Sequence, residues 1–484
     1  MDGASHRKHD KKIDLQITGI MVLCSINLRY NARILATPSP RLAMHVYPSE
    51  LVALINQRWQ ASSAAEGTAA IPEAAILPGK AALERLISTC YQVSMMREEA
   101  RPITLRLILA SPKLFPAEQG PPKGFLRLLF STPRPFNEYE LRRLSPAMDF
   151  ERSLIGIEPH PDKGFQIWGI VNSGIRWLQQ ERGGNKKTNI LPEVFVVHVT
   201  GPGMLTICKG LKIIATLNGG KLIDSTANAF QSKWMNKLFA EQRSILLQLH
   251  EIFRSSVLYP VAKIQDEFIE SLQFQLLKRV ISVTRMSRHG GTFIIFPGDS
   301  PPELAAENPY ILLKYRFRQD EAVQRQQTLM VRTIRLATTA LGDINNPDKV
   351  VTWKDYVELR HESAVYDLEE ALYEHAQFVA SLASVDGAVV TSSRGPIGFG
   401  GMIVGSLDKL TEVALASDVE GKVVSLANIE GYGSRHRSVY HLCNALHQVM
   451  AIVVSQDGNV QLAKWRNGIV TCWDLTSQMF ISDF

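Results

Sequence analysis

The chain has 484 residues, of which 45% are hydrophobic and 21% are charged, and its formal net charge is +6. This length exceeds one ordinary hydrophobic core, so we expect two or three domains in a globular protein of ordinary composition. Residues 1–43 hold seven basic and three acidic side chains. They carry most of the net charge, which argues against a nucleic-acid partner for the remaining chain.

Residues 1–43 contain one apolar run, at 15–28. This run is too short to cross a bilayer, so no membrane partner is expected. A secretory signal is an alternative for this run, weakened because the polar lead is long and no small-residue cleavage site follows cleanly. We expect residues 1–43 to be disordered, or to precede a true start at Met44.

Residues 44–230 are expected to form an N-terminal α+β region. Helical spacing follows the candidate N-cap Ser49 and returns over residues 81–96. Alternating patterns predict strands at 104–110 and 124–130, which we expect to pair with each other. Short apolar runs between turn residues predict four more strands, at 164–170, 194–199, 205–208 and 211–217.

The pattern becomes helical from residue 229 to residue 286, with Pro260 as a break. We assign residues 231–270 to a helical connector and residues 271–484 to a second domain. Its predicted helices cover 320–339, 354–382 and 438–450. Its predicted strands cover 290–297, 388–392, 451–455, 460–465 and 469–473, with turns at Asp457-Gly458 and Asn467-Gly468. The fold class is therefore α/β, with a mixed sheet flanked by helices in the C-terminal domain.

The five cysteines are scattered along the chain, at Cys24, Cys90, Cys208, Cys443 and Cys472. There is no C-x-x-C pair and no His/Cys pair at zinc-ligand spacing, so zinc is not expected. An odd and dispersed set of cysteines indicates reduced thiols in a cytoplasmic protein.

A basic and hydroxyl-rich segment, Gly433-Ser434-Arg435-His436-Arg437-Ser438, leads into a helical pattern. A helix N-terminus offers unpaired N–H groups, and two arginines can pair with phosphate oxygens. The alternative is a solvated basic turn. The same basic side chains interact unfavourably with the helix dipole, which lowers the stability of the helix. This loss of stability is easier to explain if an anion binds there.

A second segment, Asp386-Gly387-Ala388, precedes a predicted strand. Its carboxylate suits the Mg²⁺ or Mn²⁺ that accompanies a nucleotide, and its small residues permit close approach of a ligand. The alternative is an ordinary Asp-Gly turn. The glycine-rich run at 394–401 fits no phosphate-loop pattern, and we interpret it as a connection between strands.

These two segments together resemble the signature of diadenylate cyclase (DAC) domains, which join two ATP molecules into cyclic di-AMP. The similarity continues over 451–460 and 463–468, and upstream over 290–296. The region before it resembles the DisA-related DACNV group, bacterial proteins described as probable sensors. Segments that match this group are Leu77-Pro78, residues 97–102, 134–136, 140–146 and 154–156.

The resemblance implies a nucleotide site formed by Asp386, Gly387, Ala388 and the six residues 433–438. It implies an adenine nucleotide or cyclic dinucleotide as ligand, with a metal held by Asp386. One departure concerns residues 456 and 457: active cyclases usually carry glutamates there, and this chain has Gln456 and Asp457. Glutamine removes a charge that divalent cations favour, and Asp457 is only a weak substitute as a metal ligand.

Our leading hypothesis is therefore a cytoplasmic nucleotide sensor in bacterial second-messenger signalling. The alternative is an active diadenylate cyclase, in which Asp386 is catalytic and two DAC-like domains face each other in a homodimer. A scaffold that has lost its ligand is a third hypothesis, disfavoured by the intact arginine pair.

Overall fold

The computed structural model describes residues 48–65, 77–121, 124–150, 152–162, 164–173, 191–210, 212–223, 229–298, 309–318, 320–359, 362–404, 410–456 and 458–475. The predictions for residues 1–43, for a start at Met44 and for Asp457 lie outside these ranges. Within the described ranges, no helix combines the length and the apolar character needed to cross a membrane.

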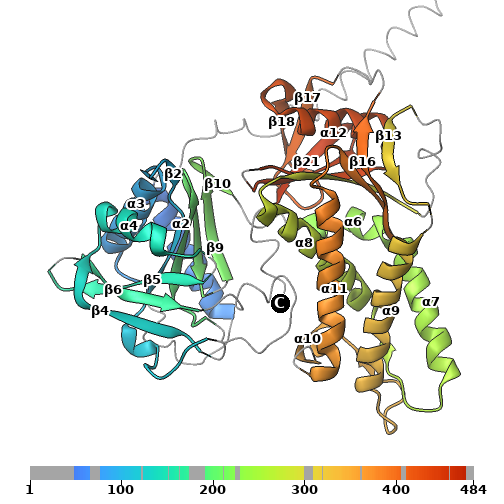
Figure 1. Ribbon diagram of the computed structural model, residues 1–484, viewed down its shortest axis with the longest axis horizontal. Helices are drawn as coiled ribbons and strands as arrows, with labels where there is room; N and C mark the ends of the chain where they lie inside the picture. The colour runs from blue at the N-terminus through green and yellow to red at the C-terminus, as the bar shows by residue number, and fades with distance from the viewer. Residues whose placement is uncertain are drawn as a thin grey trace, which may run out of the picture. The chain divides into compact units, whose positions relative to one another are not determined.

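Residues 48–223 combine helices with one large sheet (Figure 1). The helices are α2 (Pro48–Ala65), α3 (Lys80–Ser94) and α4 (Glu138–Leu144). The strands are β1 (Arg97–Glu98), β2 (Arg101–Pro102), β3 (Leu105–Leu109), β4 (Leu126–Pro135), β5 (Ser153–His160), β6 (Gly164–Asn172), β7 (Phe195–Gly201), β8 (Met204–Lys209), β9 (Lys212–Asn218) and β10 (Lys221–Ile223). In the described part of this region, eight strands form the sheet order β10-β9-β8-β7-β3-β5-β6-β4.

Strand β3 lies in the middle of this sheet, and its side chains alternate between two cores. Leu105 and Leu107 pack in the same hydrophobic cluster as residues of α2 and α3, whereas Ile108 packs in a second cluster with Trp168. The predicted pairing of 104–110 with 124–130 is wrong. Strand β3 pairs with β5 and β7, while β4 lies at the sheet edge beside β6.

Residues 229–475 form a second arrangement of helices around a mixed sheet. The helices are α6 (Lys233–Leu238), α7 (Ala240–Ser256), α8 (Asp266–Ser287), α9 (Glu321–Ala340), α10 (Trp353–Leu359), α11 (Ser363–Leu382) and α12 (Ser434–Ala445). The strands are β11 (Lys263–Ile264), β12 (Gly291–Phe296), β13 (Ile311–Arg316), β14 (Val350–Val351), β15 (Ala388–Ser392), β16 (Gly395–Ile403), β17 (Glu412–Ala416), β18 (Val424–Asn428), β19 (Met450–Val454), β20 (Val460–Arg466) and β21 (Ile469–Leu475). Nine of the described strands follow the order β13-β16-β15-β12-β19-β20-β21-β17-β18.

The two faces of this nine-stranded sheet carry different helices, as Figure 1 shows for α8 and α11 on one side and α12 on the other. Alternation along β12 explains the arrangement. Phe293 and Ile295 pack in the cluster that includes α8 and α11. Ile294 and Phe296 pack on the opposite face with Leu442 of α12. The α/β fold class is confirmed.

Helix α6 packs into the core of this second region. The Trp234 ring lies against the Trp473 ring of β21, with centroids 4.9 Å apart. Phe239, which lies between α6 and α7, packs edge-on against Phe274 of α8. The predicted domain boundaries at 230 and 270 stay predictions, but part of the segment called a connector shares the hydrophobic cluster of the C-terminal sheet.

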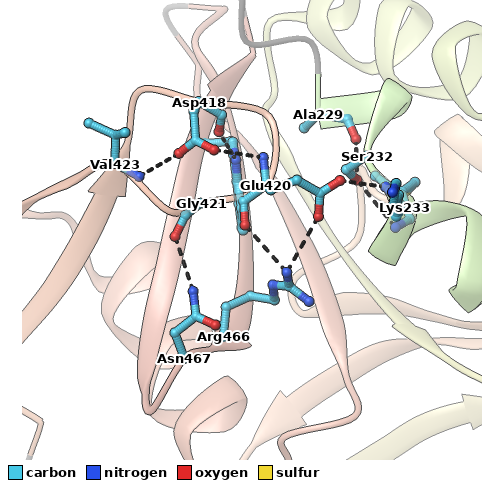
Figure 2. A network of polar contacts seen from close by, with 11 residues as sticks. Ala229, Ser232, Lys233, Asp418, Glu420, Gly421, Val423, Arg466 and Asn467 are labelled. Carbon is cyan, nitrogen blue, oxygen red and sulfur yellow. Dashed lines mark hydrogen bonds and ion pairs between the residues drawn. The ribbon is translucent and has the colours of Figure 1, made fainter.

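A polar network fixes this packing at the β17–β18 turn (Figure 2). Glu420 accepts a hydrogen bond from the backbone N–H of Lys233 at 2.7 Å, and one of its oxygens lies 3.5 Å from a guanidinium nitrogen of Arg466. Asp418 orders the turn by accepting from the N–H groups of Glu420 and Val423. The network thereby joins the start of α6, the β17–β18 turn and the β20–β21 turn.

The structure also corrects the predictions for residues 354–382 and 394–401. The helix predicted over 354–382 is interrupted, so that α10 ends at Leu359 and α11 begins at Ser363. The run at 394–401 is not a connection but most of β16, which pairs with β15 and β13. Its glycines allow close strand contact: a Cβ on Gly398 would lie 2.5 Å from the Tyr315 carbonyl oxygen.

Candidate functional site

The residues singled out by sequence lie where the central strands of the nine-stranded sheet begin or end, along one edge of the sheet. Asp386 stands two residues before β15, and Gly290 stands one residue before β12. These strands are parallel neighbours, so their starts lie at the same sheet edge. Strand β19 runs antiparallel to β12, with Val454 paired to Gly291, so Gln456 also lies at this edge.

Helix α12 begins at this site. The structure corrects its bounds: it covers Ser434–Ala445 rather than 438–450, so the basic triplet occupies the first turn. The reason is local, because Gly433 is the extended N-cap and the N–H of Arg437 already donates to the Gly433 carbonyl. At the other end, the chain enters β19 at Met450.

The start of α12 is electropositive. Among the described residues, no side chain caps its N-terminus, and its first turn holds no acidic residue. Arg435 and Arg437 are exposed, and neither forms an ion pair within the described ranges. The free N–H groups and the two guanidiniums therefore add positive potential at one place. A bound anion would relieve the repulsion between these positive groups.

Arg435 is positioned by the turn before β12. Its guanidinium Nη1 donates to the His289 carbonyl oxygen at 3.2 Å. This contact needs glycine at the next position: a Cβ on Gly290 would lie 2.6 Å from that Nη1 and 3.2 Å from the Gln456 nitrogen. Gly290 thus lets Arg435 and Gln456 approach the same point.

The role of His289 and Gly290 is the part of the site that the motifs do not predict. His289 has no recognisable partner in the sequence, because its contribution is a backbone carbonyl. The available signal is the pair Gly290-Gly291 at the start of an apolar run, which marks close approach of other groups. Gly290 also has a φ of +68°, a conformation that favours glycine.

The remaining residues of the basic segment differ in their surroundings. Ser434 and Ser438 are exposed. His436 is half-buried, and its ring lies 5.8 Å from the Tyr432 ring and 6.1 Å from the Tyr440 ring, measured between centroids. The phenol of Tyr440 is itself fixed by donating to Gln461, and burial raises the pKa of Tyr440. An aromatic cluster thus supports the first turn of α12.

Asp386 is exposed, whereas Ala388 is buried as the first residue of β15. Among the described residues, no cluster of three or more His, Cys, Asp or Glu side chains is placed to hold a metal. Nucleotide-associated Mg²⁺ ordinarily uses one or two carboxylates together with phosphates and water. Asp386 alone therefore fits the role of the single protein carboxylate in such a metal site.

The two candidate glycines are predicted to respond differently to alanine. Gly387 has a φ of +111°, and a Cβ there would lie 2.7 Å from the Gly400 carbonyl carbon. Gly387→Ala should lower the free energy of unfolding by about 2–4 kcal/mol. Gly433 has a φ of −64° and open space beside it, so Gly433→Ala should cost no more than about 1 kcal/mol. Urea unfolding of both variants measures this, and equal losses would contradict it.

Residues 72–172 match the family model described as "Probable sensor domain DACNV". The match includes α3, α4 and strands β1 to β6, and it confirms the DACNV resemblance of this segment. A comparison with curated protein sequences finds no significant match.

Proposed function

We propose that the C-terminal region, residues 229–475, binds an adenine nucleotide or a cyclic dinucleotide at the start of α12. The chain then acts as a nucleotide sensor in bacterial second-messenger signalling. The observation that supports this most directly is the exposed pair Arg435 and Arg437 at an uncapped helix N-terminus. The DACNV match of residues 72–172 supports the sensor part of the proposal.

The proposed ligand would contact the site through its phosphates. The N–H groups of the first turn and the guanidinium of Arg437 are open to it, and Gly433 leaves space for a phosphate beside the backbone. Mg²⁺ or Mn²⁺ would be held by Asp386 and by the phosphate oxygens, offsetting the negative charge of the nucleotide.

An active diadenylate cyclase is the second candidate, favoured by the exposed carboxylate of Asp386 at the same sheet edge as Arg435. Gln456 weighs against it. This neutral residue stands two positions after β19, with its backbone nitrogen close to Gly290, where the resemblance leads one to expect a metal-binding glutamate. Phosphoryl transfer depends chiefly on metal ions and positioning, so loss of that charge favours binding without turnover.

The experiment is a calorimetric titration of the full-length protein with ATP and Mg²⁺ or Mn²⁺, followed by a search for cyclic di-AMP in the same samples. We expect saturable binding without product. Gln456→Glu should tighten Mn²⁺ binding, because it restores a carboxylate at the metal position. Asn459→Asp, which adds the same charge in the same turn, is the matched control and should not do so.

Two results would change the proposal. Steady formation of cyclic di-AMP by the unmodified protein would replace the sensor with the cyclase. Failure to bind either ATP or cyclic di-AMP, by a protein that is folded by circular dichroism, would overturn the nucleotide site itself.

A further inference from the structure

A separate cavity lies within the segment that matches the DACNV model, between helix α3 and the start of strand β6. Its volume is about 190 Å³. The residues that line it are Arg85, Ser88, Thr89, Phe136, Gly164 and Phe165. A cavity needs about 10–15 Å³ to hold one water molecule, so this one has room for a small organic ligand. It is smaller than the clefts of roughly 300–1,000 Å³ that hold larger ligands such as nucleotides.

Three polar side chains of α3 reach this cavity from one face of the helix. Arg85, Ser88 and Thr89 stand at positions i, i+3 and i+4, which places them side by side. None of the three makes a side-chain hydrogen bond or ion pair within the described ranges. By comparison, the hydroxyls of Ser94 and Thr284 donate to backbone carbonyls of their own helices, those of Tyr91 and Val280.

The described lining residues of the cavity carry one positive charge, that of Arg85, and no carboxylate. The Arg85 guanidinium lies over the turn that opens β6, where a Cβ on Gly164 would be 3.9 Å from its Cζ atom. Gly164 has a φ of +77°, which suits glycine and leaves this approach unobstructed. A guanidinium with two hydroxyls beside it matches the acceptor pattern of a carboxylate or a phosphate.

The opposite wall is aromatic. The Phe136 and Phe165 rings meet nearly edge-to-face, with centroids 5.8 Å apart and planes at 73°. Phe165 is buried in the core of the sheet, whereas Phe136 is only partly buried and offers a ring surface to the cavity. A ligand held by its anionic group at Arg85 would therefore place an apolar or planar part against Phe136.

We propose that this cavity binds a small organic anion, through a carboxylate or phosphate at Arg85, Ser88 and Thr89 and an apolar part at Phe136. The proposal extends beyond nucleotide binding at α12 and does not depend on it. It assigns to the DACNV segment a ligand class of its own.

Benzoate is a suitable probe, because it joins a carboxylate to a planar ring, and benzamide is its neutral counterpart. Calorimetry on the full-length protein should show benzoate binding that saturates below about 10 mM, with benzamide binding at least tenfold weaker. Arg85→Gln should weaken benzoate binding at least tenfold. Lys80→Gln removes the same charge from an exposed position of the same helix and should leave binding unchanged.

Three outcomes would overturn the proposal: no saturable binding of benzoate, equal affinity for benzamide, or equal losses in the Arg85 and Lys80 variants. Unchanged melting temperatures verify that both variants are folded, as expected for exposed positions. The variant Arg435→Ala/Arg437→Ala should keep its benzoate affinity, which distinguishes a failure of this cavity from a failure of the nucleotide site.

Discussion

ATP binding is expected to weaken by roughly 10²–10⁴-fold in Arg435→Ala/Arg437→Ala. Each arginine supplies a charge-assisted hydrogen bond worth about 1.5–3 kcal/mol, and about 1.4 kcal/mol corresponds to tenfold in affinity. The fold should not suffer, because both side chains are exposed and oppose the dipole of α12. Calorimetry with ATP and Mg²⁺ measures the affinity, and thermal unfolding tests stability.

The matched control is Arg318→Ala/Arg325→Ala, which removes two exposed arginines from other elements of the same region. It should bind ATP like the unmodified protein. Similar losses in the two double variants would mean that ATP responds to overall charge rather than to the start of α12. An unchanged affinity in the Arg435/Arg437 variant would remove the basis of the proposed site.

Glu369→Ala is expected to lower the free energy of unfolding by about 3–5 kcal/mol, the usual cost of breaking a buried ion pair. Glu369 is 2% exposed, and its two carboxylate oxygens accept hydrogen bonds from Arg279 of α8 and Tyr356 of α10. Removal of the carboxylate leaves the Arg279 guanidinium buried without its counter-charge. Urea unfolding followed by circular dichroism measures the loss.

A double variant, Arg279→Met/Glu369→Leu, separates charge from packing. Replacing both partners by apolar side chains removes the desolvation cost, so its stability should return to within about 1–2 kcal/mol of the original. If Glu369→Ala were as stable as the unmodified protein, the ion pair would not hold α8, α10 and α11 together.

Local signals predicted many elements of the fold. Strand β15 covers the predicted residues 388–392, and the Asn467-Gly468 turn joins β20 to β21 with both residues at positive φ. These succeed because alternation and turn chemistry act between near neighbours. The order of strands depends on distant partners, so the pairing of β4 was predicted wrongly.

Edge strands were among the elements that the sequence did not predict. Strands β13 and β18 are the two outermost strands of the nine-stranded sheet, and both expose much of their length. An edge strand has one partner and little burial, so its sequence shows weak alternation. The run that forms β16 was misjudged for another reason. Its glycines allow neighbouring strands to approach closely. From a single sequence, such glycines look the same as glycines in a turn.

In the candidate site too, local motifs were predicted from the sequence, whereas contacts between distant residues were not. The Asp386 and Arg435 segments were recognisable because each combines chemistry and turn residues in a few positions. That they share one sheet edge with Gln456 follows from the parallel pairing of β12 with β15 and the antiparallel pairing with β19. The contact of Arg435 with the His289 carbonyl is invisible to side-chain patterns.

The packing of Trp234 on Trp473 sets a limit on how the chain can be divided for biochemical work. A fragment that begins at residue 271 would keep the nine-stranded sheet but would lose the indole that covers Trp473 and the backbone N–H that binds Glu420. Exposed aromatic surface of this kind promotes aggregation. An autonomous C-terminal fragment therefore needs to start near residue 229, ahead of α6.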